Sequence, residues 1–269
     1  MIIKSIKEMQ DCNIEMLQSF DALCRKHGLS YSLAYGVILG YVRDKHLIPW
    51  DDDIDVFMFR DDYEKLRKIP KDQFDPDYEL VTPYDLDYFF DFVPRYICKR
   101  YSAESADVFD QDHKPIVENI RMDIFILDNS FEDRRHKSQI RKLIFTYLQA
   151  TRFRKHTLDR PLRIRLLKWF VGLTAMGKTL PKILDKYERI SLECKEKTSL
   201  IYMSDGLPAV IEDHFPREWF EDPEEVMFYG IRTFVPHNLE TLLELWFGNY
   251  KELPPEEDRV PKHFRLEMD

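Results

Sequence analysis

Acidic residues crowd one short stretch of the sequence, IPWDDDIDVFMFR at residues 48–60. It contains Asp51, Asp52, Asp53 and Asp55, and the apolar run that follows them is typical of a buried strand. Asp53 and Asp55 lie two positions apart, so on a strand both side chains point from the same face. Two carboxylates held roughly 7 Å apart at the edge of a core repel each other unless a cation lies between them. The pair therefore predicts a site for a hard divalent cation, Mg²⁺ or Mn²⁺, which binds carboxylate oxygens.

A third acid, Asp123, stands in IRMDIFIL at residues 120–127, again between strand-forming apolar residues. Three strand-borne carboxylates that converge on one point would form a phosphoryl- or nucleotidyl-transfer site, in which metal ions hold the attacking and leaving oxygens. We therefore predict that Asp53, Asp55 and Asp123 are both the metal ligands and the catalytic residues. Asp52 is predicted to shape the approach of the substrate, and the alternative for it is an ordinary turn residue.

A glycine turn precedes the acids, in AYGVILGYVRDK at residues 34–45. Gly36 follows a predicted strand and precedes a helical turn, where free backbone N–H groups and the helix dipole favour an anion. Arg43 is a candidate phosphate ligand because its fork engages two oxygens, and the alternative is a solvated arginine at a helix end. Lys99, in a predicted strand, is a second candidate cation. Together with Asp52, these three residues are the predicted substrate-binding residues.

The segment LAYGVILGYVRDKHLIPWDDDIDVFM, residues 33–58, closely resembles the signature of the LicD family of phosphotransferases. That signature reads as a glycine turn, an arginine and then PWDDDID. The similarity continues more loosely through VENIRMDIFILD (117–128) and LWFGNYKELPPEED (245–258). Val37 departs from the family pattern, which has Ser or Thr there, so the resemblance predicts backbone rather than hydroxyl contacts to a donor phosphate.

The resemblance implies the nucleotidyltransferase fold shared with polymerase-beta-like enzymes, and metal-binding acids at Asp53, Asp55 and Asp123. It also implies a CDP-activated donor. The family includes bacterial phosphocholine transferases that act on teichoic acids, so the expected reaction moves phosphocholine from CDP-choline to a teichoic acid or its lipid-linked precursor, releasing CMP. Transfer of ribitol phosphate or glycerol phosphate, or nucleotidyl transfer to a protein or RNA, would use the same acids and stays open.

Helix and strand patterns alternate along the first half of the chain and must position these residues. Residues 5–28 form a predicted amphipathic helix, capped by Ser5 and closed by Gly28. Further helices are predicted from residue 60 and at 238–248. Strands are predicted at 31–36, 54–59, 78–82, 95–101 and 120–127. The predicted fold class is α/β (α+β), with a nucleotidyltransferase-like mixed sheet, flanking helices and a basic helical insertion. We predict a catalytic core at 1–132, a basic helical region at 133–200, and a segment at 201–269 that completes the active-site cleft.

Charge is segregated along the chain. Between residues 134 and 189 there are 16 Lys and Arg against 3 acids, a net charge of +13, whereas the rest of the chain carries −22. Residues 160–184 mix basic and apolar side chains, which suits a helix on an anionic membrane surface. The alternatives are that the apolar residues pack in the core, or that the charge binds an anionic polymer acceptor or nucleic acid. A nucleic-acid partner is not expected, because it would leave the acid pair without a purpose.

The location of the protein is predicted from its cysteines and its hydropathy. Four scattered cysteines favour a reducing compartment. Charged residues interrupt the apolar residues near the N-terminus, so we expect no signal peptide. The sequence has no run of 18 apolar residues, so we expect no transmembrane helix. We therefore expect a cytoplasmic protein, with peripheral contact at the inner face of the plasma membrane.

A choline group would be bound by aromatic faces. Two aromatic-rich stretches offer such faces, PYDLDYFFDF at 83–92 and ELWFGNY at 244–250. Core packing is the competing explanation for both stretches.

Overall fold

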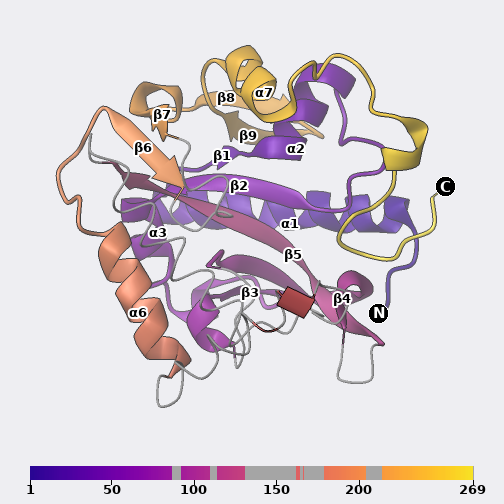
Figure 1. Ribbon diagram of the computed structural model, residues 1–269, viewed down its shortest axis with the longest axis horizontal. Helices are drawn as coiled ribbons and strands as arrows, with labels where there is room; N and C mark the ends of the chain where they lie inside the picture. The colour runs from indigo at the N-terminus through magenta and orange to yellow at the C-terminus, as the bar shows by residue number, and fades with distance from the viewer. Residues whose placement is uncertain are drawn as a thin grey trace.

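The computed structural model describes residues 1–86, 92–109, 114–130, 162–163, 166, 179–203 and 214–268 of the 269-residue chain (Figure 1). Most of the basic region 133–200, including most of the proposed membrane-facing stretch 160–184, lies outside the described residues. Within the part that is described, no helix combines the length and apolar character needed to cross a membrane.

A mixed sheet organises the described chain. Its strand order is β1-β2-β5-β4-β3. β6 pairs with the end of β5, and β7 pairs with β6. β2 and β5 are parallel, whereas the other neighbours are antiparallel. The strands are β1 (Ser32–Leu33), β2 (Ile54–Phe59), β3 (Tyr78–Val81), β4 (Arg95–Phe109), β5 (Pro115–Asn129), β6 (Leu200–Met203) and β7 (His214–Pro216). β8 (Glu224–Phe228) and β9 (Ile231–Val235) form a separate hairpin. The predicted mixed α/β fold is confirmed.

Helix α1 (Ile6–His27) covers one face of the sheet (Figure 1). Its predicted caps form: the Ser5 hydroxyl accepts from the Glu8 N–H, and Gly28 takes the left-handed conformation with φ 62°. The apolar stripe packs inward, and Phe20 meets Tyr96 of β4 edge to face with ring centroids 5.3 Å apart. This face of the sheet is therefore the main core.

Alternation along β2 assigns its side chains to two faces. Ile54, Val56 and Met58 are buried on the α1 side. Asp55 and Phe57 point to the other face, where Phe57 packs against Trp246 of α7 (Leu239–Phe247). One end of this second face is thus covered by aromatic side chains, and the other end carries acid.

The remaining helices flank the strands. They are α2 (Tyr35–Leu39), which runs into a π-helical turn at Gly40–Asp44, α3 (Arg60–Leu66) and α6 (Leu180–Ser191). The predicted strand at 31–36 was too long, because β1 ends at Leu33 and α2 begins at Tyr35. Tyr35 has φ 44°, which turns the chain sharply and places Gly36 inside the helix. Conversely, β4 and β5 extend well past the predicted ranges.

Candidate active site

The acids of β2 and β5 lie side by side. The two strands run parallel with Asp55 directly opposite Asp123, and Ile54 opposite Met122. Since side chains alternate along both strands, the two carboxylates point from the same face. Asp53 precedes β2 and belongs to the same group. The structure therefore brings together the three predicted metal ligands, Asp53, Asp55 and Asp123.

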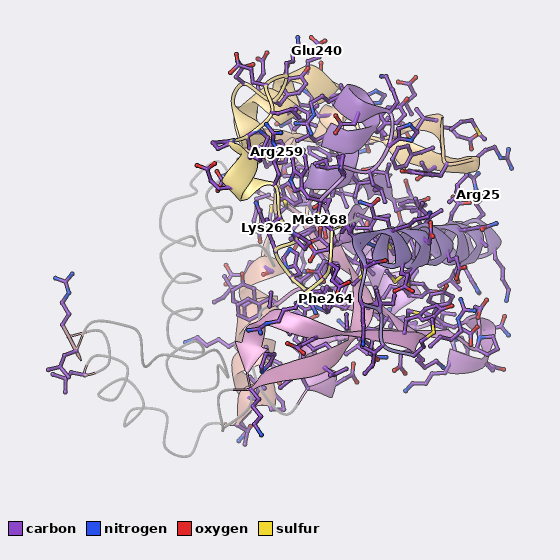
Figure 2. The ribbon with its side chains drawn as sticks, turned by 90° about the vertical axis from the view of Figure 1, so that its right-hand side faces the viewer. Arg25, Glu240, Arg259, Lys262, Phe264 and Met268 are labelled. Carbon is purple, nitrogen blue, oxygen red and sulfur yellow. The ribbon has the colours of Figure 1, made fainter. Side chains whose placement is uncertain are left out.

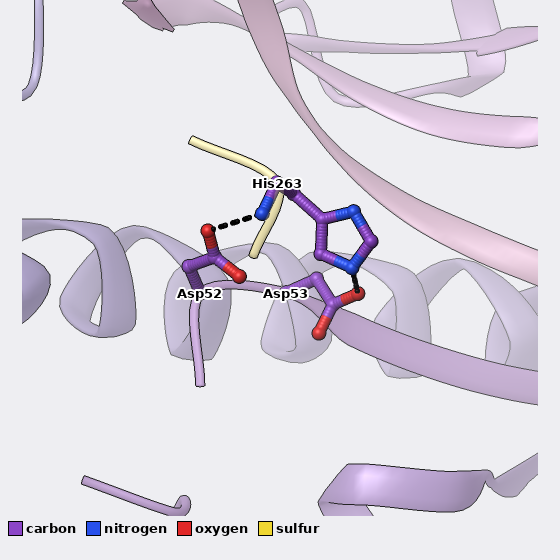
Figure 3. A group of neighbouring side chains, drawn as sticks. All are labelled: Asp52, Asp53 and His263. Atoms are coloured by element: carbon purple, nitrogen blue, oxygen red, sulfur yellow. Dashed lines mark hydrogen bonds and ion pairs between the residues drawn. The ribbon is translucent and has the colours of Figure 1, made fainter. Parts of the chain in front are cut away.

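A histidine that the sequence reasoning missed lies against the first of these acids. The Nε2 atom of His263 is 2.8 Å from Oδ2 of Asp53 (Figure 3). The two side chains are 41% and 26% exposed, so the pair lies at the open edge of the site. No motif surrounds this histidine, which stands six residues from the end of the sequence.

Asp52 holds the backbone that carries this histidine. Its Oδ2 accepts the N–H groups of His263 at 2.9 Å and Phe264 at 2.7 Å, and its Oδ1 accepts that of Lys262 at 3.3 Å. Asp52 is only 1% exposed. Its carboxylate is therefore directed at the C-terminal segment and away from any open cleft, which differs from its predicted contact with the substrate.

Residues 262–267 form a C-terminal strap across the sheet. The His263 carbonyl accepts the Ala106 N–H at 2.8 Å, and the Arg265 N–H donates to the Glu104 carbonyl at 2.8 Å. Glu267 then pairs with the chain just before α1. Figure 2 shows the approach to this strap, from the lobe that carries α7 down past Arg259 to Lys262, Phe264 and Met268. The strap fixes the imidazole beside the acids.

Gly36 and the acidic stretch are in direct contact. A Cβ atom added at Gly36 would lie 2.5 Å from Oδ2 of Asp51. That oxygen is buried and has no hydrogen-bond partner. Glycine is therefore required here because a carboxylate packs against its Cα atom. Gly36, which was predicted to bind an anionic part of the substrate, thus lies against the carboxylate of Asp51.

Two arginines stand on the β5 side of the acids. Arg95 of β4 donates from Nε to Oδ1 of Asp123 at 3.0 Å, and Nε of Arg121 lies 3.9 Å from the same oxygen. The guanidinium-bearing side chains are 8% and 11% exposed. Asp123 thus has a buried cationic partner, and Arg121 adds a second positive charge nearby.

The charges change the protonation of the acids. Burial raises the pKa of Asp55 well above its usual range, and the neighbouring carboxylates of Asp53 and Asp123 raise it further. Burial and the same kind of repulsion raise the pKa of Asp51. Burial also opposes ionisation of Asp53, but the charge and hydrogen bond of His263 outweigh it and lower that pKa. Burial favours a neutral imidazole, yet Asp53 outweighs it and raises the pKa of His263 to about 9.

The residues present fit a hard divalent cation. Asp55 and Asp123 stand opposite each other on parallel strands with Asp53 two positions before Asp55, and burial, followed by the charges of Asp53 and Asp123, raises the pKa of Asp55. A divalent cation bound to these oxygens would offset that cost. Asp53, Asp55 and Asp123 would hold the ion. Among the described residues, the group whose ligand atoms all lie within 4.8 Å of one another is Asp52, Asp53 and His263, and the three predicted ligands do not lie that close together. Asp52 is less suited to ligation because both its oxygens already accept backbone N–H groups.

The side chains of Arg43 and Lys99, which were predicted to bind phosphate, lie away from Asp53, Asp55 and Asp123. Nε and Nη2 of Arg43 donate to the Asp44 carboxylate at 2.9 and 2.8 Å, and its Nη1 donates to the Tyr250 carbonyl at 3.3 Å. Its guanidinium thus braces the chain around the π-helical turn. Lys99 is exposed on β4, where its backbone N–H donates to the Asp77 carbonyl. The structure shows no contact of either side chain with the acids among the described residues.

The aromatic stretches have packing roles where they are described. Trp246 packs against Tyr35 with ring centroids 4.8 Å apart, and Tyr250 is buried. Phe92 stacks on Tyr187. Residues 87–91 of the first stretch lie outside the described part of the chain.

A mixed sheet with flanking helices, in which two neighbouring parallel strands present paired acids, is consistent with a nucleotidyltransferase-like α+β protein. Residues 28–175 match the nucleotidyltransferase domain described as LicD/FKTN/FKRP. Because this match covers more than half of the chain, the protein belongs to that family, and the predicted family is confirmed. A curated relative is the lipopolysaccharide cholinephosphotransferase LicD of Haemophilus influenzae. It is 28% identical over 281 residues, which cover 97% of this chain and 97% of that protein.

Proposed function

We propose that this protein transfers phosphocholine from CDP-choline to a sugar hydroxyl of a cell-surface glycan and releases CMP. The observation that carries the proposal is the registered pair Asp55 and Asp123, with Asp53 beside it, in a chain of the LicD/FKTN/FKRP family. The curated relative is named a cholinephosphotransferase, which supports phosphocholine as the transferred group.

The acceptor belongs to the class of cell-surface glycans. The relative's name specifies lipopolysaccharide, whereas the sequence resemblance predicts teichoic acid or its lipid-linked precursor. Both present sugar hydroxyls on an anionic carrier, so the same chemistry serves either. Purified acceptors of each kind, offered with labelled CDP-choline, distinguish them by which one becomes labelled.

The proposed reaction is an in-line displacement at the phosphorus that carries choline. The acceptor hydroxyl oxygen forms the new P–O bond, the bond from phosphorus to the CMP oxygen breaks, and CMP leaves with the electron pair. A divalent cation held by Asp53, Asp55 and Asp123 would neutralise the diphosphate charge. One carboxylate, that of Asp123 in this proposal, would accept the hydroxyl proton. His263 and Arg95 hold Asp53 and Asp123 in place.

The test is metal-dependent CMP release from a panel of CDP-linked donors. We expect release from CDP-choline with Mg²⁺ or Mn²⁺, loss of release in EDTA, and no comparable release from CDP-ribitol or CDP-glycerol. Asp53→Asn and Asp55→Asn should each lower the rate by at least about 100-fold while the far-UV circular dichroism stays unchanged. Asp11→Asn, on the exposed face of α1, is the matched control with wild-type activity. Full activity of the D53N/D55N protein would refute the assignment.

We also propose that the enzyme works at the cytoplasmic face of the membrane, where the stretch 160–184 contacts anionic lipid through the residues that precede α6, because Leu180 and Leu184 are buried in the protein. The support is the composition of that stretch, which combines basic with apolar side chains. Co-sedimentation with anionic vesicles at physiological salt tests it. Binding that is absent from neutral vesicles is expected, and absence of binding to anionic vesicles would reject the proposal.

A further inference from the structure

His263 belongs to a compact group of side chains that could bind a metal ion. One ligand atom from each of Asp52, Asp53 and His263 lies within 4.8 Å of the others, and among the described residues no other three acids, cysteines or histidines are grouped so tightly. The imidazole nitrogen comes from the C-terminal strap, and the carboxylates come from the loop that leads into β2 (Figure 3). The group therefore offers a nitrogen ligand beside the oxygen ligands of Asp55 and Asp123.

The spacing of the imidazole and the first acid suits a shared metal ion. Nε2 of His263 lies 2.8 Å from Oδ2 of Asp53. Two ligand atoms bound to one ion at about 2.1 Å lie about 3.0 Å apart in an octahedral site and about 3.4 Å apart in a tetrahedral one. The two atoms therefore need to separate by only about 0.2–0.6 Å for an ion to bind both. Binding replaces the proton between them, and that proton passes to the solvent.

The strap holds the imidazole in this position through its backbone. The N–H groups of His263 and Phe264 donate to Oδ2 of Asp52 at 2.9 and 2.7 Å. The His263 carbonyl also accepts the Ala106 N–H at 2.8 Å. Because the ring is placed before an ion arrives, ligation costs little further conformational entropy. Asp52 acts here as a positioning residue, since its oxygens accept the backbone that carries the ligand.

The pair lies where a bound ion could also reach a substrate. The side chains of His263 and Asp53 are 41% and 26% exposed. An ion between them would thus keep coordination positions open to water or to a phosphate oxygen.

We propose that His263 is a metal ligand, whose Nε2 binds the same divalent cation as the Asp53 carboxylate. This deepens the proposed function, on which it rests for the presence of a cation at Asp53. A nitrogen ligand favours Co²⁺ or Zn²⁺, and to a lesser degree Mn²⁺, over Mg²⁺, which takes oxygen ligands. The alternative is that His263 only forms an ion pair with Asp53 and competes with the cation. The two roles predict opposite changes in metal affinity when the imidazole is removed.

Metal titration of the EDTA-stripped protein distinguishes the two roles. His263→Gln should weaken the binding of Mn²⁺ and Co²⁺ at least about tenfold, since even the loss of an outer-shell partner costs 10–100-fold, and Mg²⁺ affinity should fall less. His237→Gln is the matched control, because Nε2 of His237 contacts the backbone carbonyl of Asp222 at 2.9 Å. It should bind the ions as wild type does. A smaller loss for Mn²⁺ and Co²⁺ in His263→Gln, or a gain, would overturn the proposal.

Electron spin echo envelope modulation of bound Mn²⁺ identifies the ligand atom directly, so that the result does not depend on the folding of a variant. Wild type should show a ¹⁴N coupling, and histidine labelled with ¹⁵N in its ring should convert it to a ¹⁵N coupling. His237→Gln should keep the coupling and His263→Gln should lack it. Absence of the coupling from wild type, or its persistence in His263→Gln, would overturn the assignment of the ligand.

The proposed function and this metal ligand can fail independently. A histidine coupling that depends on His263, without CMP release from any CDP-linked donor, would leave the ligand standing and refute the function. CMP release from CDP-choline by a protein whose bound Mn²⁺ has no nitrogen ligand would do the reverse.

Discussion

Replacement of Asp52 with alanine should detach the C-terminal strap from the start of β2. Asp52 contributes no atom to an open cleft, yet it accepts three backbone N–H groups from residues 262–264. Without its carboxylate, these three amides lose their acceptor and His263 loses its fixed position beside Asp53. The variant should therefore lose both stability and the alignment of the acids.

The size of the effect follows from the distances. A hydrogen bond to a charged group contributes about 1.5–3 kcal/mol, and the bonds at 2.7 and 2.9 Å are strong while the one at 3.3 Å is weak. Part of this gain is offset by burial of the carboxylate, which raises the pKa of Asp52. We expect Asp52→Ala to lower the free energy of unfolding by about 3 kcal/mol. Asp52→Asn keeps an oxygen for the two strong bonds and should cost about 1–2 kcal/mol.

Urea unfolding at pH 7, followed by circular dichroism in EDTA, measures these differences. Asp53→Ala serves as the control, because it removes the partly exposed ion pair with His263 but leaves the anchor in place. Its effect should stay within about 1 kcal/mol. The expected order of loss is D52A, then D52N, then D53A. A D52A protein within about 1 kcal/mol of wild type would show that the strap is not held as described here.

Two further predictions concern the glycine turn and pH. Gly36→Ala should lower activity, because the added methyl group displaces the Asp51 carboxylate. The free energy of unfolding should change by less than about 2 kcal/mol, because the better helix propensity of alanine opposes the crowding. Unimpaired CMP release would show that the contact between Gly36 and Asp51 does not matter for activity. For the apo protein, the His263–Asp53 pair contributes stability fully below about pH 6.5, where the unfolded histidine is also protonated, and loses it as pH rises through about 9. The urea midpoint in EDTA should fall across this window by the equivalent of about 1 kcal/mol, a figure reduced because the imidazole is 41% exposed. His263→Gln should lack this part of the decline, although Asp51, Asp52 and Asp55, whose pKa values are raised, still titrate. An identical pH profile in the two proteins would refute the pairing.

Much of the fold could be predicted from the sequence, because several helices and strands are determined by their own residues. The helix α1 follows from the spacing of its apolar residues and from its caps, and it forms as expected. The strand β2 follows from the apolar run after the acids. The outer parts of β4 and β5 escaped prediction because residues such as Ser102 and Glu104 carry no apolar alternation. They become strand by pairing with each other, and β4 pairs with the strap as well.

The candidate site likewise contains residues that the sequence predicted and residues that it could not predict. Residue type and spacing sufficed to nominate Asp53, Asp55 and Asp123, and the sheet places the last two in register. His263 could not be nominated, since its partner Asp53 lies 210 positions earlier and nothing local marks the histidine. Arg95 was likewise overlooked because a lone arginine at the start of a strand is usually solvated.

The cations that balance the acids come from distant parts of the chain, which has a consequence for how the site forms. Asp53 and Asp55 lie in one short segment, but Asp123, Arg95 and His263 arrive from β5, β4 and the C-terminal strap. Until these elements pair with the rest of the sheet, Asp53 and Asp55 are solvated and their mutual repulsion is screened. Once they close, burial makes each missing cation costly, as the raised pKa of Asp55 already indicates. Formation of the site is therefore coupled to completion of the sheet, and substitutions in the strap should affect the acids as strongly as substitutions in the strands that carry them.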